Sequence, residues 1–321
     1  MRCLCCGKEI KSSASAHEKT HSWHSHCIKS FFNTSQMPEL DISEEKLEAL
    51  ATMTINQGLT VPGVQKKLSL HLSTDINSRL TMVDYPAGYI LKPQTEEYES
   101  LPEFENLAMR LAEAAGIKTV PNALIKNNGQ YAYITKRIDR DLSDLENPKM
   151  YAMEDFCQLA ERITADKYKG SYEKCSRIIK DYSSRPGLDI TEMFLRIVFS
   201  YIVGNSDLHL KNFSLIESAP GNREFYLSDA YDILPVNIVL PEDTEQLALT
   251  LNGKKSNFRR KDFIAFADKC DIKEKAAEKM IYKMCSLRAK FLRLCDESYL
   301  SDEKKDAMKT LITDRIEIVS S

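Results

Sequence analysis

The sequence predicts an α+β protein in which a sheet-rich part precedes a helical part. Between about residues 68 and 134, short apolar segments alternate with polar residues, as at Leu68, Leu70 and Leu72, which is the period of half-buried strands. From about residue 150 onward, apolar residues recur at helical spacing instead. The chain has 321 residues, about twice the length of a typical domain. Together these observations favour two domains or one two-lobed enzyme.

The composition excludes several classes of protein. Apolar residues make up 43% of the chain and charged residues 28%, so the chain is not disordered throughout. The 44 Lys and Arg residues nearly balance the 47 Asp and Glu residues, which gives no electrostatic reason to expect a nucleic-acid ligand. No apolar stretch approaches the length of a membrane span, and the N-terminus lacks the apolar segment of a secretory signal. We therefore expect a cytoplasmic protein with no membrane contact and no direct nucleic-acid binding.

Cysteine and histidine are concentrated at the N-terminus. The segments Cys3-x-x-Cys6 and His24-x-x-Cys27 offer two pairs of ligands, separated by a stretch long enough for a small loop or hairpin. Two such pairs can close a tetrahedral zinc site, and four protein ligands leave no open position. In a reducing compartment, clustered cysteines more often bind metal than form disulfides. We therefore predict a structural Zn²⁺ site in a module at residues 1–35.

The four zinc ligands are not fixed by spacing alone. The neighbouring residues that could replace one of them are Cys5, His17, His21 and His26. A flexible metal-scavenging tail or incidental thiols are the alternative interpretation. Trp23, Phe31 and Phe32 could provide the apolar floor that so small a module needs.

The expected elements follow from periodicity and from turn signals. Residues 33–43 are expected to be a linker, and Ser43 to cap a helix that includes Leu47 and Leu50. Strands are expected at 68–72, 80–82, 89–92, 123–125, 131–134 and 213–216. Asn127-Asn128-Gly129 is a hairpin signal. The further helices are expected at 102–115, 153–164, 172–182, 191–204, 261–268, 274–296 and 302–319.

The chemically richest segment follows the apolar helix at 191–204. It runs Gly-Asn-Ser-Asp-Leu-His-Leu-Lys-Asn over residues 204–212, so that Asp207 precedes Asn212 by five residues, and Asp232 follows after a hairpin. Phosphoryl transfer needs a carboxylate for the attacking hydroxyl and oxygen ligands for Mg²⁺. We interpret Asp207 as the base, and Asn212 and Asp232 as the metal ligands. The alternative is a polar loop with ordinary helix caps.

Two upstream features agree with phosphoryl transfer. Lys92 ends a short strand, where a cation could hold phosphates, and the helix after it carries Glu103 and Glu105 as possible ion-pair partners. The turn containing Gly63 could bring backbone N–H groups close to phosphate, although it is not a Gly-x-Gly-x-x-Gly loop. Each feature is weak by itself, because a lysine at a strand end is usually solvated.

Seven segments carry a resemblance to HipA-type toxin kinases, in the same order and over about residues 55 to 320. They are Thr-Val-Pro-Gly-Val-Gln-Lys-Lys-Leu, Tyr-Ile-Leu-Lys-Pro, Glu-Asn-x-x-Met-x-Leu-Ala, Ile-Thr-Lys-Arg-Ile-Asp-Arg, Glu-Asp-Phe-Cys-Gln, Asn-Ser-Asp-x-His-x-Lys-Asn-Phe and Ala-Tyr-Asp-Ile. The resemblance implies a bilobal protein-kinase-like fold, with the kinase N-lobe at 36–145 and the helical C-lobe at 146–321. It also implies ATP, Mg²⁺ and phosphorylation of serine or threonine in an aminoacyl-tRNA synthetase, which would halt translation.

The nucleotide-binding residues can be carried over by position. The resemblance assigns Lys92 to the ATP phosphates, and Lys136 and Ile138 to the backbone hinge that holds adenine. Gly63 and Lys67 fall in the phosphate loop of the family. Asp207, Asn212 and Asp232 receive the same roles that the residue pattern suggests.

Three further residues have roles that the resemblance leaves less fixed. Thr60 stands where the family has an autophosphorylated serine, so autophosphorylation there is plausible. His209 is expected to orient the catalytic loop rather than to transfer a proton. Lys211 could neutralise the transferring phosphoryl group, with a solvated loop cation as the alternative.

The segment before the phosphate loop departs from the family. Full-length members have a sheet-rich subdomain of about a hundred residues there, whereas about 55 residues precede the loop here. We expect a separate small antitoxin partner that resembles this subdomain, or a helix-turn-helix antitoxin. The alternatives to a protein kinase are a small-molecule or lipid kinase of the same fold, and a non-catalytic zinc-anchored binding module.

Overall fold

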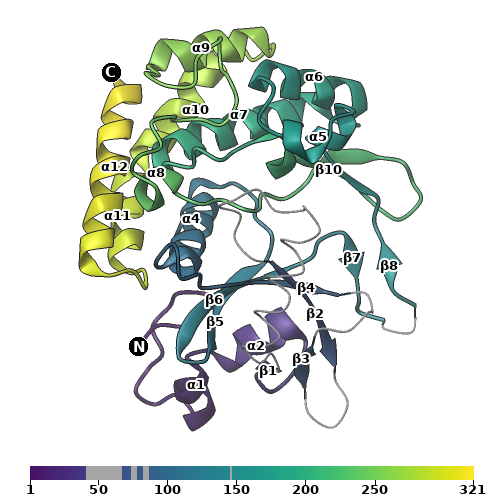
Figure 1. Ribbon diagram of the computed structural model, residues 1–321, viewed down its shortest axis with the longest axis vertical. Helices are drawn as coiled ribbons and strands as arrows, with labels where there is room; N and C mark the ends of the chain where they lie inside the picture. Colours follow the sequence, from purple (N-terminus) through teal and green to yellow (C-terminus); the bar gives the residue numbers. More distant parts are fainter. Residues whose placement is uncertain (41–66, 74–77, 82–86, 145–146) are drawn as a thin grey trace. The chain divides into compact units, whose positions relative to one another are not determined.

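The computed structural model describes residues 1–40, 67–73, 78–81, 87–144 and 147–321 (Figure 1). The chain divides into two compact units, one formed by residues 1–106 and 121–148 and the other by 107–120 and 149–321. The helix expected after Ser43, together with Thr60 and Gly63, lies outside the described residues.

The first unit is built on a six-stranded sheet. Its strands are β1 (Glu39–Leu40), β2 (Leu68–Ser73), β3 (Arg79–Thr81), β4 (Tyr89–Pro93), β5 (Asn122–Asn127) and β6 (Gln130–Lys136). Their order in the sheet is β1-β3-β2-β4-β6-β5, and every neighbouring pair is antiparallel except β1 with β3. The predicted strands and their antiparallel sheet are therefore present, while β1 lies in the stretch that was expected to be a linker.

The β5–β6 hairpin forms at the predicted turn. Asn128 and Gly129 both have positive φ angles, 49° and 82°, as a two-residue turn that matches strand twist requires. The middle of each strand is buried, including Leu124 and Tyr133. Strands buried on both faces need cover on both faces.

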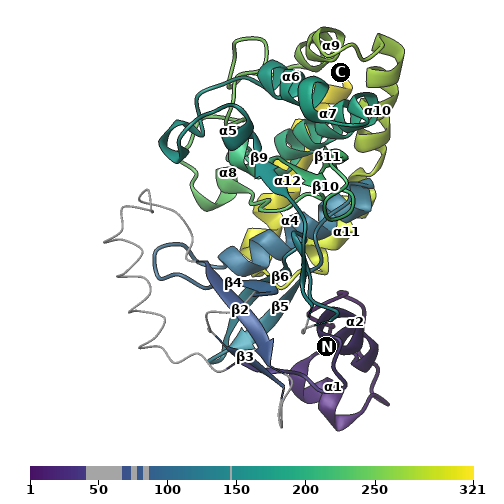
Figure 2. The same ribbon diagram turned by 90° about the vertical axis from the view of Figure 1, so that its right-hand side faces the viewer.

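The N-terminal segment provides part of that cover, and Figure 2 shows α1 (Ala16–His21) and α2 (Ser25–Phe32) beside the sheet. The indole Nε1 of Trp23 donates to the carbonyl of Leu124 at 3.1 Å. The amide of Leu124 donates in turn to the carbonyl of Leu4 at 3.0 Å. The Tyr89 hydroxyl donates to the carbonyl of Phe31 at 3.2 Å. Trp23 is completely buried, so this segment and the sheet share one core.

The second unit is mainly helical. The division between the units falls within α4 (Leu101–Ala115), which ends at Gly116. The other helices are α5 (Phe156–Leu159), α6 (Tyr172–Tyr182), α7 (Pro186–Val203), α8 (Val236–Val239), α9 (Arg260–Lys269), α10 (Glu274–Ser286), α11 (Arg288–Asp296) and α12 (Asp302–Ser320). The fold is therefore α+β, as the sequence predicts. None of the described helices is both long and apolar enough to cross a membrane.

Short strands and 3₁₀ turns complete the described chain. A small antiparallel sheet has the order β11-β10-β9, with β9 at Met153–Asp155, β10 at Ser214–Glu217 and β11 at Phe225–Leu227. The remaining short elements are β7 (Arg140–Asp141), β8 (Lys149–Met150), η1 (Thr164–Asp166) and η2 (Leu210–Asn212).

Two expected helices differ from the structure. The helix expected at 153–164 is instead β9, which pairs with β10, followed by the single-turn helix α5. Asp155 ends the strand and caps α5, because its side chain accepts the amide of Gln158 at 2.9 Å. The helix expected at 274–296 breaks at Leu287 into α10 and α11. Its buried positions keep the helical period across the break, so the apolar pattern does not mark it.

Helix α7 directly precedes the predicted catalytic segment. Its C-terminal half is buried almost continuously, and Gly204 ends it with a φ angle of 80°. A Cβ at Gly204 would lie 2.5 Å from Cδ2 of Leu311 on α12. Both the left-handed backbone and this close approach therefore favour glycine. The chain then turns directly into the segment that contains Asp207.

Candidate active site

The polar segment after α7 is held by its own hydrogen bonds. Asn212 is buried, and its Oδ1 accepts the amide of His209 at 2.9 Å. The hydroxyl of Tyr172, on α6, donates to the carbonyl of Leu208 at 2.9 Å. The side chain of Asp207 is 45% exposed. A fixed backbone thus presents one accessible carboxylate, which suits a residue that must meet a substrate.

The structure brings Asp232 to the same place. The Nδ2 atom of Asn212 lies 3.3 Å from Oδ2 of Asp232, although 19 residues separate the two in the chain. Asp232 has a φ of 59°, in the left-handed region that few residues other than glycine adopt. Such strain is kept where surrounding structure fixes the backbone, and functional sites are a common location.

The segment leading to Asp232 is fixed by buried charged residues of α7. The carboxylate of Asp189 accepts the amide of Leu227 at 2.8 Å. The guanidinium of Arg196 donates to the carbonyl of Ser228 at 2.7 Å. Both charged side chains are almost completely buried. Because two separate turns of one helix hold consecutive residues of this segment, the position of Asp232 is tied to that of α7.

Asn212 and Asp232 fit a hard divalent cation. A carboxylate oxygen and an amide oxygen are the donors that Mg²⁺ prefers, with water and phosphate completing an octahedron. The two side chains are adjacent and lie at the end of a rigid loop. These residues would hold Mg²⁺, with the Asp232 carboxylate and the Asn212 amide oxygen as its protein donors.

Lys211 forms an ion pair that its sequence position does not reveal. Its Nζ lies 2.6 Å from Oδ2 of Asp155, the residue that caps α5. The hydroxyl of Tyr231 donates to the carbonyl of Lys211 at 3.0 Å. The ammonium therefore faces a carboxylate contributed by a distant part of the chain.

His209 is buried beside the carboxylate of Asp207. Burial lowers the pKa of its imidazole below the ordinary value of 6.5, and the nearby Asp207 carboxylate opposes this shift. Its Nε2 lies 3.9 Å from Oδ2 of Asp207, which is too long for a hydrogen bond. The contact of His209 that holds this segment is its backbone amide, which donates to Asn212, whereas Nδ1 of the imidazole has no hydrogen-bond partner among the described residues. The positioning role of its side chain stays a prediction.

Tyr168, like Asp155, is a residue of this site that sequence reasoning missed. Its hydroxyl donates to Oδ1 of Asp207 at 2.6 Å. It belongs to the loop between η1 and α6, 39 residues before Asp207, and no motif marks it. Only the folded structure brings the two side chains together.

Lys92, the predicted ATP-binding lysine, lies in the sheet-rich unit. Lys92 lies on β4, and both Lys92 and Glu105 are buried with their charged groups in ion-pair contact. Glu105 is one of the two glutamates that the sequence offers as partners of Lys92. A buried lysine needs such a partner to stay charged. The ammonium also lies 5.4 Å from the ring centroid of Tyr133.

The other predicted nucleotide residues lie around the ends of strands in this unit. Lys136 ends β6, and its Nζ donates to the carbonyl of Ser30 at 3.3 Å, while burial lowers the pKa of its ammonium. Ile138 follows and is half-buried. Lys67 is exposed and directly precedes β2.

The structure also brings together the four predicted zinc ligands. The ligand atoms of Cys3, Cys6, His24 and Cys27 all lie within 4.8 Å of one another. Sγ of Cys6 and Nδ1 of His24 are 3.4 Å apart, and Nε2 of His24 lies 3.2 Å from the carbonyl of Glu9. An Nε2–H that donates to a carbonyl leaves Nδ1 free for a metal. This set of thiols and one imidazole fits tetrahedral Zn²⁺.

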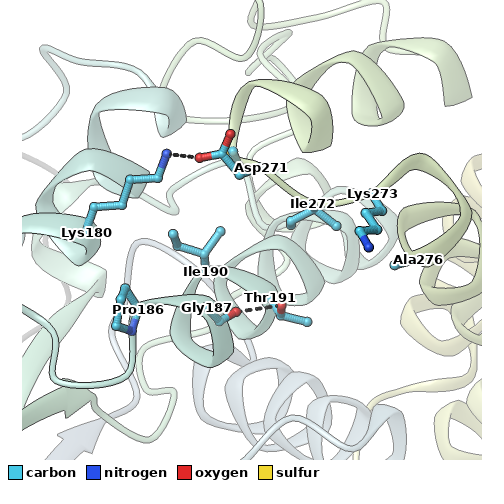
Figure 3. A pocket seen from close by; sticks show the side chains of 10 residues that line it. Lys180, Pro186, Gly187, Ile190, Thr191, Asp271, Ile272, Lys273 and Ala276 are labelled. Atoms are coloured by element: carbon cyan, nitrogen blue, oxygen red, sulfur yellow. Dashed lines mark hydrogen bonds and ion pairs between the residues drawn. The ribbon is translucent and has the colours of Figure 1, made fainter.

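A separate pocket of about 400 Å³ lies in the helical unit (Figure 3). Residues from the end of α6, the start of α7 and the α9–α10 connection line it, and Lys180 pairs with Asp271 at its edge. None of the described residues that line it is a predicted catalytic or nucleotide-binding residue.

Comparison with known proteins identifies related sequences. A family model described as the HipA-like C-terminal domain matches residues 59–290. A Haemophilus influenzae protein named "Putative kinase" is 25% identical over 307 residues, which cover 88% of each chain. A Sinorhizobium fredii protein named "Putative kinase Y4dM" is 30% identical over 233 residues, which cover 67% of this chain and 54% of that relative. The chain thus spans about half the length of this second relative.

Solved structures agree in fold. A chain of the Shewanella oneidensis MR-1 toxin–antitoxin complex of HipA, HipB and operator DNA has a TM-score of 0.69 at 18% identity, covering 80% of this chain and 64% of that one. The Helicobacter pylori proinflammatory kinase CtkA has a TM-score of 0.54 at 14% identity, covering 78% of this chain and 93% of that one. Because the family model matches most of the sequence, the chain belongs to the HipA-like C-terminal domain family and has a kinase-like fold.

Proposed function

We propose that this protein is an ATP-dependent serine/threonine protein kinase and the toxin of a toxin–antitoxin system. The observation that carries the proposal is the contact of Asn212 with Asp232 at 3.3 Å. Asn212 belongs to the same hydrogen-bonded loop as Asp207, whose carboxylate is accessible. A base for the acceptor hydroxyl beside two oxygen donors for Mg²⁺ is the minimum that phosphoryl transfer requires. The kinase names of the relatives support the same reaction.

Each residue has one task in the proposed reaction. Asp207 accepts a hydrogen bond from the acceptor hydroxyl and takes its proton as the oxygen attacks the γ-phosphorus. Mg²⁺, when bound through Asn212 and Asp232, supplies charge neutralisation at the phosphates. The proposed task of Lys211 is to neutralise the transferring phosphoryl group, for which its ammonium must leave the Asp155 carboxylate. His209 holds the loop in place as a neutral group.

ATP binding is assigned to the residues that the resemblance identifies. Lys92 holds phosphate oxygens while Glu105 keeps its ammonium charged and oriented. The backbone at Lys136 and Ile138 holds adenine, and Gly63 and Lys67 belong to the phosphate loop.

The proposed acceptor is a serine or threonine of an aminoacyl-tRNA synthetase, whose modification would inhibit translation in the cytoplasm. Autophosphorylation at Thr60 is proposed as a second reaction. An antitoxin is the proposed partner, either a small protein resembling the N-terminal subdomain or a helix-turn-helix protein. The structural neighbour in a complex with HipB and operator DNA supports a partner of this type.

Phosphoproteomics after induced expression tests the proposed function. The wild-type chain should add phosphate to serine or threonine of a defined protein, and Asp207→Asn should abolish that change. Phosphorylated small molecules or lipids without any phosphorylated protein would favour a small-molecule kinase of the same fold instead.

We also propose that Cys3, Cys6, His24 and Cys27 bind a structural Zn²⁺. The support is the mutual approach of their ligand atoms and the contact of His24 Nε2 with the Glu9 carbonyl. Because the same segment contacts β5 and β4, the metal would stabilise the sheet that carries Lys92.

A further inference from the structure

Tyr168 contacts the carboxylate that an acceptor must reach. Its hydroxyl lies 2.6 Å from Oδ1 of Asp207, within the range of an O–H donor to an ionised carboxylate. Burial and the facing Asp207 carboxylate both raise the pKa of Tyr168, so the phenol stays protonated and remains a donor.

The contact between the Tyr168 hydroxyl and Asp207 is the same kind of contact that an acceptor hydroxyl must make with a general base. A general base must lie within about 2.6–3.2 Å of the hydroxyl whose proton it takes. The serine or threonine acceptor would therefore make the same O–H···O contact that Tyr168 makes now. The other oxygen, Oδ2, lies 3.9 Å from Nε2 of His209, which is beyond hydrogen-bond distance. Of these two contacts, only the one between Tyr168 and Oδ1 is therefore a hydrogen bond.

The tyrosine is held by its ring as well as by its hydroxyl. Its ring stands edge-on to that of His209, with centroids 5.1 Å apart, and the ammonium of Lys167 lies 4.9 Å from its centroid. The backbone beside it is fixed, because the amide of Leu210 donates to the carbonyl of Lys167 at 3.2 Å. The residue is 42% exposed, so its side chain can rotate outward without unfolding the loop.

We propose that Tyr168 is a gate on the acceptor position, with its hydroxyl occupying the place of the incoming serine or threonine hydroxyl on Asp207. The inference rests on the proposed role of Asp207 as the base. Phosphoryl transfer then requires the Tyr168 side chain to rotate away before the acceptor binds. The gate restrains transfer to water and to protein in the same way, because both acceptors need the same carboxylate oxygen.

Replacing Tyr168 with phenylalanine removes the hydroxyl and keeps the ring contacts with His209 and Lys167. The full-length variant is assayed with γ-labelled MgATP, using dephosphorylated casein and water as acceptors. The proposal predicts that Tyr168→Phe raises kcat/KM for casein and the rate of ATP hydrolysis by roughly tenfold or more, since a donor to a charged group no longer has to be displaced. The KM for ATP should stay unchanged.

Two variants separate the gate from the proposed function. Tyr282→Phe, at an exposed tyrosine of α10, should leave all rates unchanged. Asp207→Asn should abolish transfer in both the wild-type and the Tyr168→Phe backgrounds; if it does not, the proposed role of Asp207 fails, and the gate with it.

The remaining outcomes decide on the gate alone. If Asp207→Asn abolishes transfer while Tyr168→Phe lowers the rates or leaves them unchanged, the gate is overturned. Lowered rates would instead make Tyr168 a residue that orients the base, and unchanged rates would give its hydroxyl no role in transfer. If the wild-type chain hydrolyses ATP but does not label casein, Tyr168→Phe must raise the hydrolysis rate, and an unchanged rate overturns the gate. Absence of both transfer and hydrolysis in both chains would contradict the proposed function itself. Label found on Tyr168 itself would make that residue an acceptor, which also overturns the proposal.

Discussion

Lys92 and Glu105 place two opposite charges inside the sheet-rich unit, where both side chains are almost completely buried. Removing one charge leaves the other in a low-dielectric surrounding, which costs about 3–5 kcal/mol in comparable buried pairs. We therefore expect Lys92→Met to lower the free energy of unfolding by about 3 kcal/mol, measured by urea denaturation. The double variant Lys92→Met, Glu105→Met should recover most of that loss. Losses that simply add would contradict a coupled pair.

His209 should make stability depend on pH. Burial lowers its pKa in the folded protein below the ordinary 6.5, so in the window below pH 6.5 the unfolded chain binds more protons than the folded one. The stability that neutral His209 provides is fully present above pH 6.5 and is lost as the pH falls through its lowered pKa. His209→Gln should therefore show a shallower loss of unfolding free energy between pH 7 and pH 5 in urea titrations.

A control variant isolates this effect. Met150→Leu, at an exposed methionine of β8, changes no ionisable side chain and should keep the wild-type slope. Equal slopes for wild type and His209→Gln would contradict the assignment of His209 as a buried neutral group.

At the scale of residues, the sequence predicts what a local motif contains. Asp207 and Asn212 share one short segment, and Asp232 follows one hairpin later, so spacing alone brings them into one hypothesis. Tyr168 and Asp155 reach the same site from other parts of the chain, and only tertiary packing reveals their contacts with Asp207 and Lys211. No periodicity or motif records such contacts.

At the scale of elements, strong turn signals and continuous apolar faces are predicted best. The β5–β6 hairpin forms at Asn128 and Gly129, where the residue types match positive φ angles. The helix expected at 153–164 is wrong because residues 153–155 pair with β10, a partner supplied by a segment some 60 residues later. Tertiary pairing overrides local helical preference in such short segments.

The four proposed zinc ligands of the N-terminal module predict the metal content of the protein. Wild-type protein should contain about one zinc per chain, because four ligand atoms lie within 4.8 Å of one another. Cys6→Ser should remove the metal and lower the thermal midpoint by several degrees, as roughly 1–2 kcal/mol or more of stability is lost. Elemental analysis and calorimetry measure both changes.

Cys5→Ser is the matched control, because Cys5 is adjacent but outside the group of four. It should keep both the zinc and the midpoint. Amide hydrogen exchange at Leu124, which donates to the carbonyl of Leu4, should accelerate in Cys6→Ser only. Loss of zinc in Cys5→Ser with retention in Cys6→Ser would reassign the ligand set.

At the scale of the whole molecule, the order of sheet-rich and helical parts and the order of the motifs predict the α+β fold and the family. The identity of the acceptor cannot be predicted in this way, because acceptor recognition depends on surface shape rather than on the nucleotide motifs. The near balance of 44 basic and 47 acidic residues favours a protein acceptor over nucleic acid.

The central claim is that Asp207 acts with Asn212 and Asp232 in transfer of the γ-phosphoryl group of ATP to a protein hydroxyl. The most direct test incubates purified chain, γ-labelled ATP and Mg²⁺ with a bacterial lysate and identifies the labelled amino acid. The account predicts label on serine or threonine, with a loss of roughly a hundredfold or more in Asp207→Asn and Asp232→Asn. Undiminished labelling of protein by either variant would contradict it.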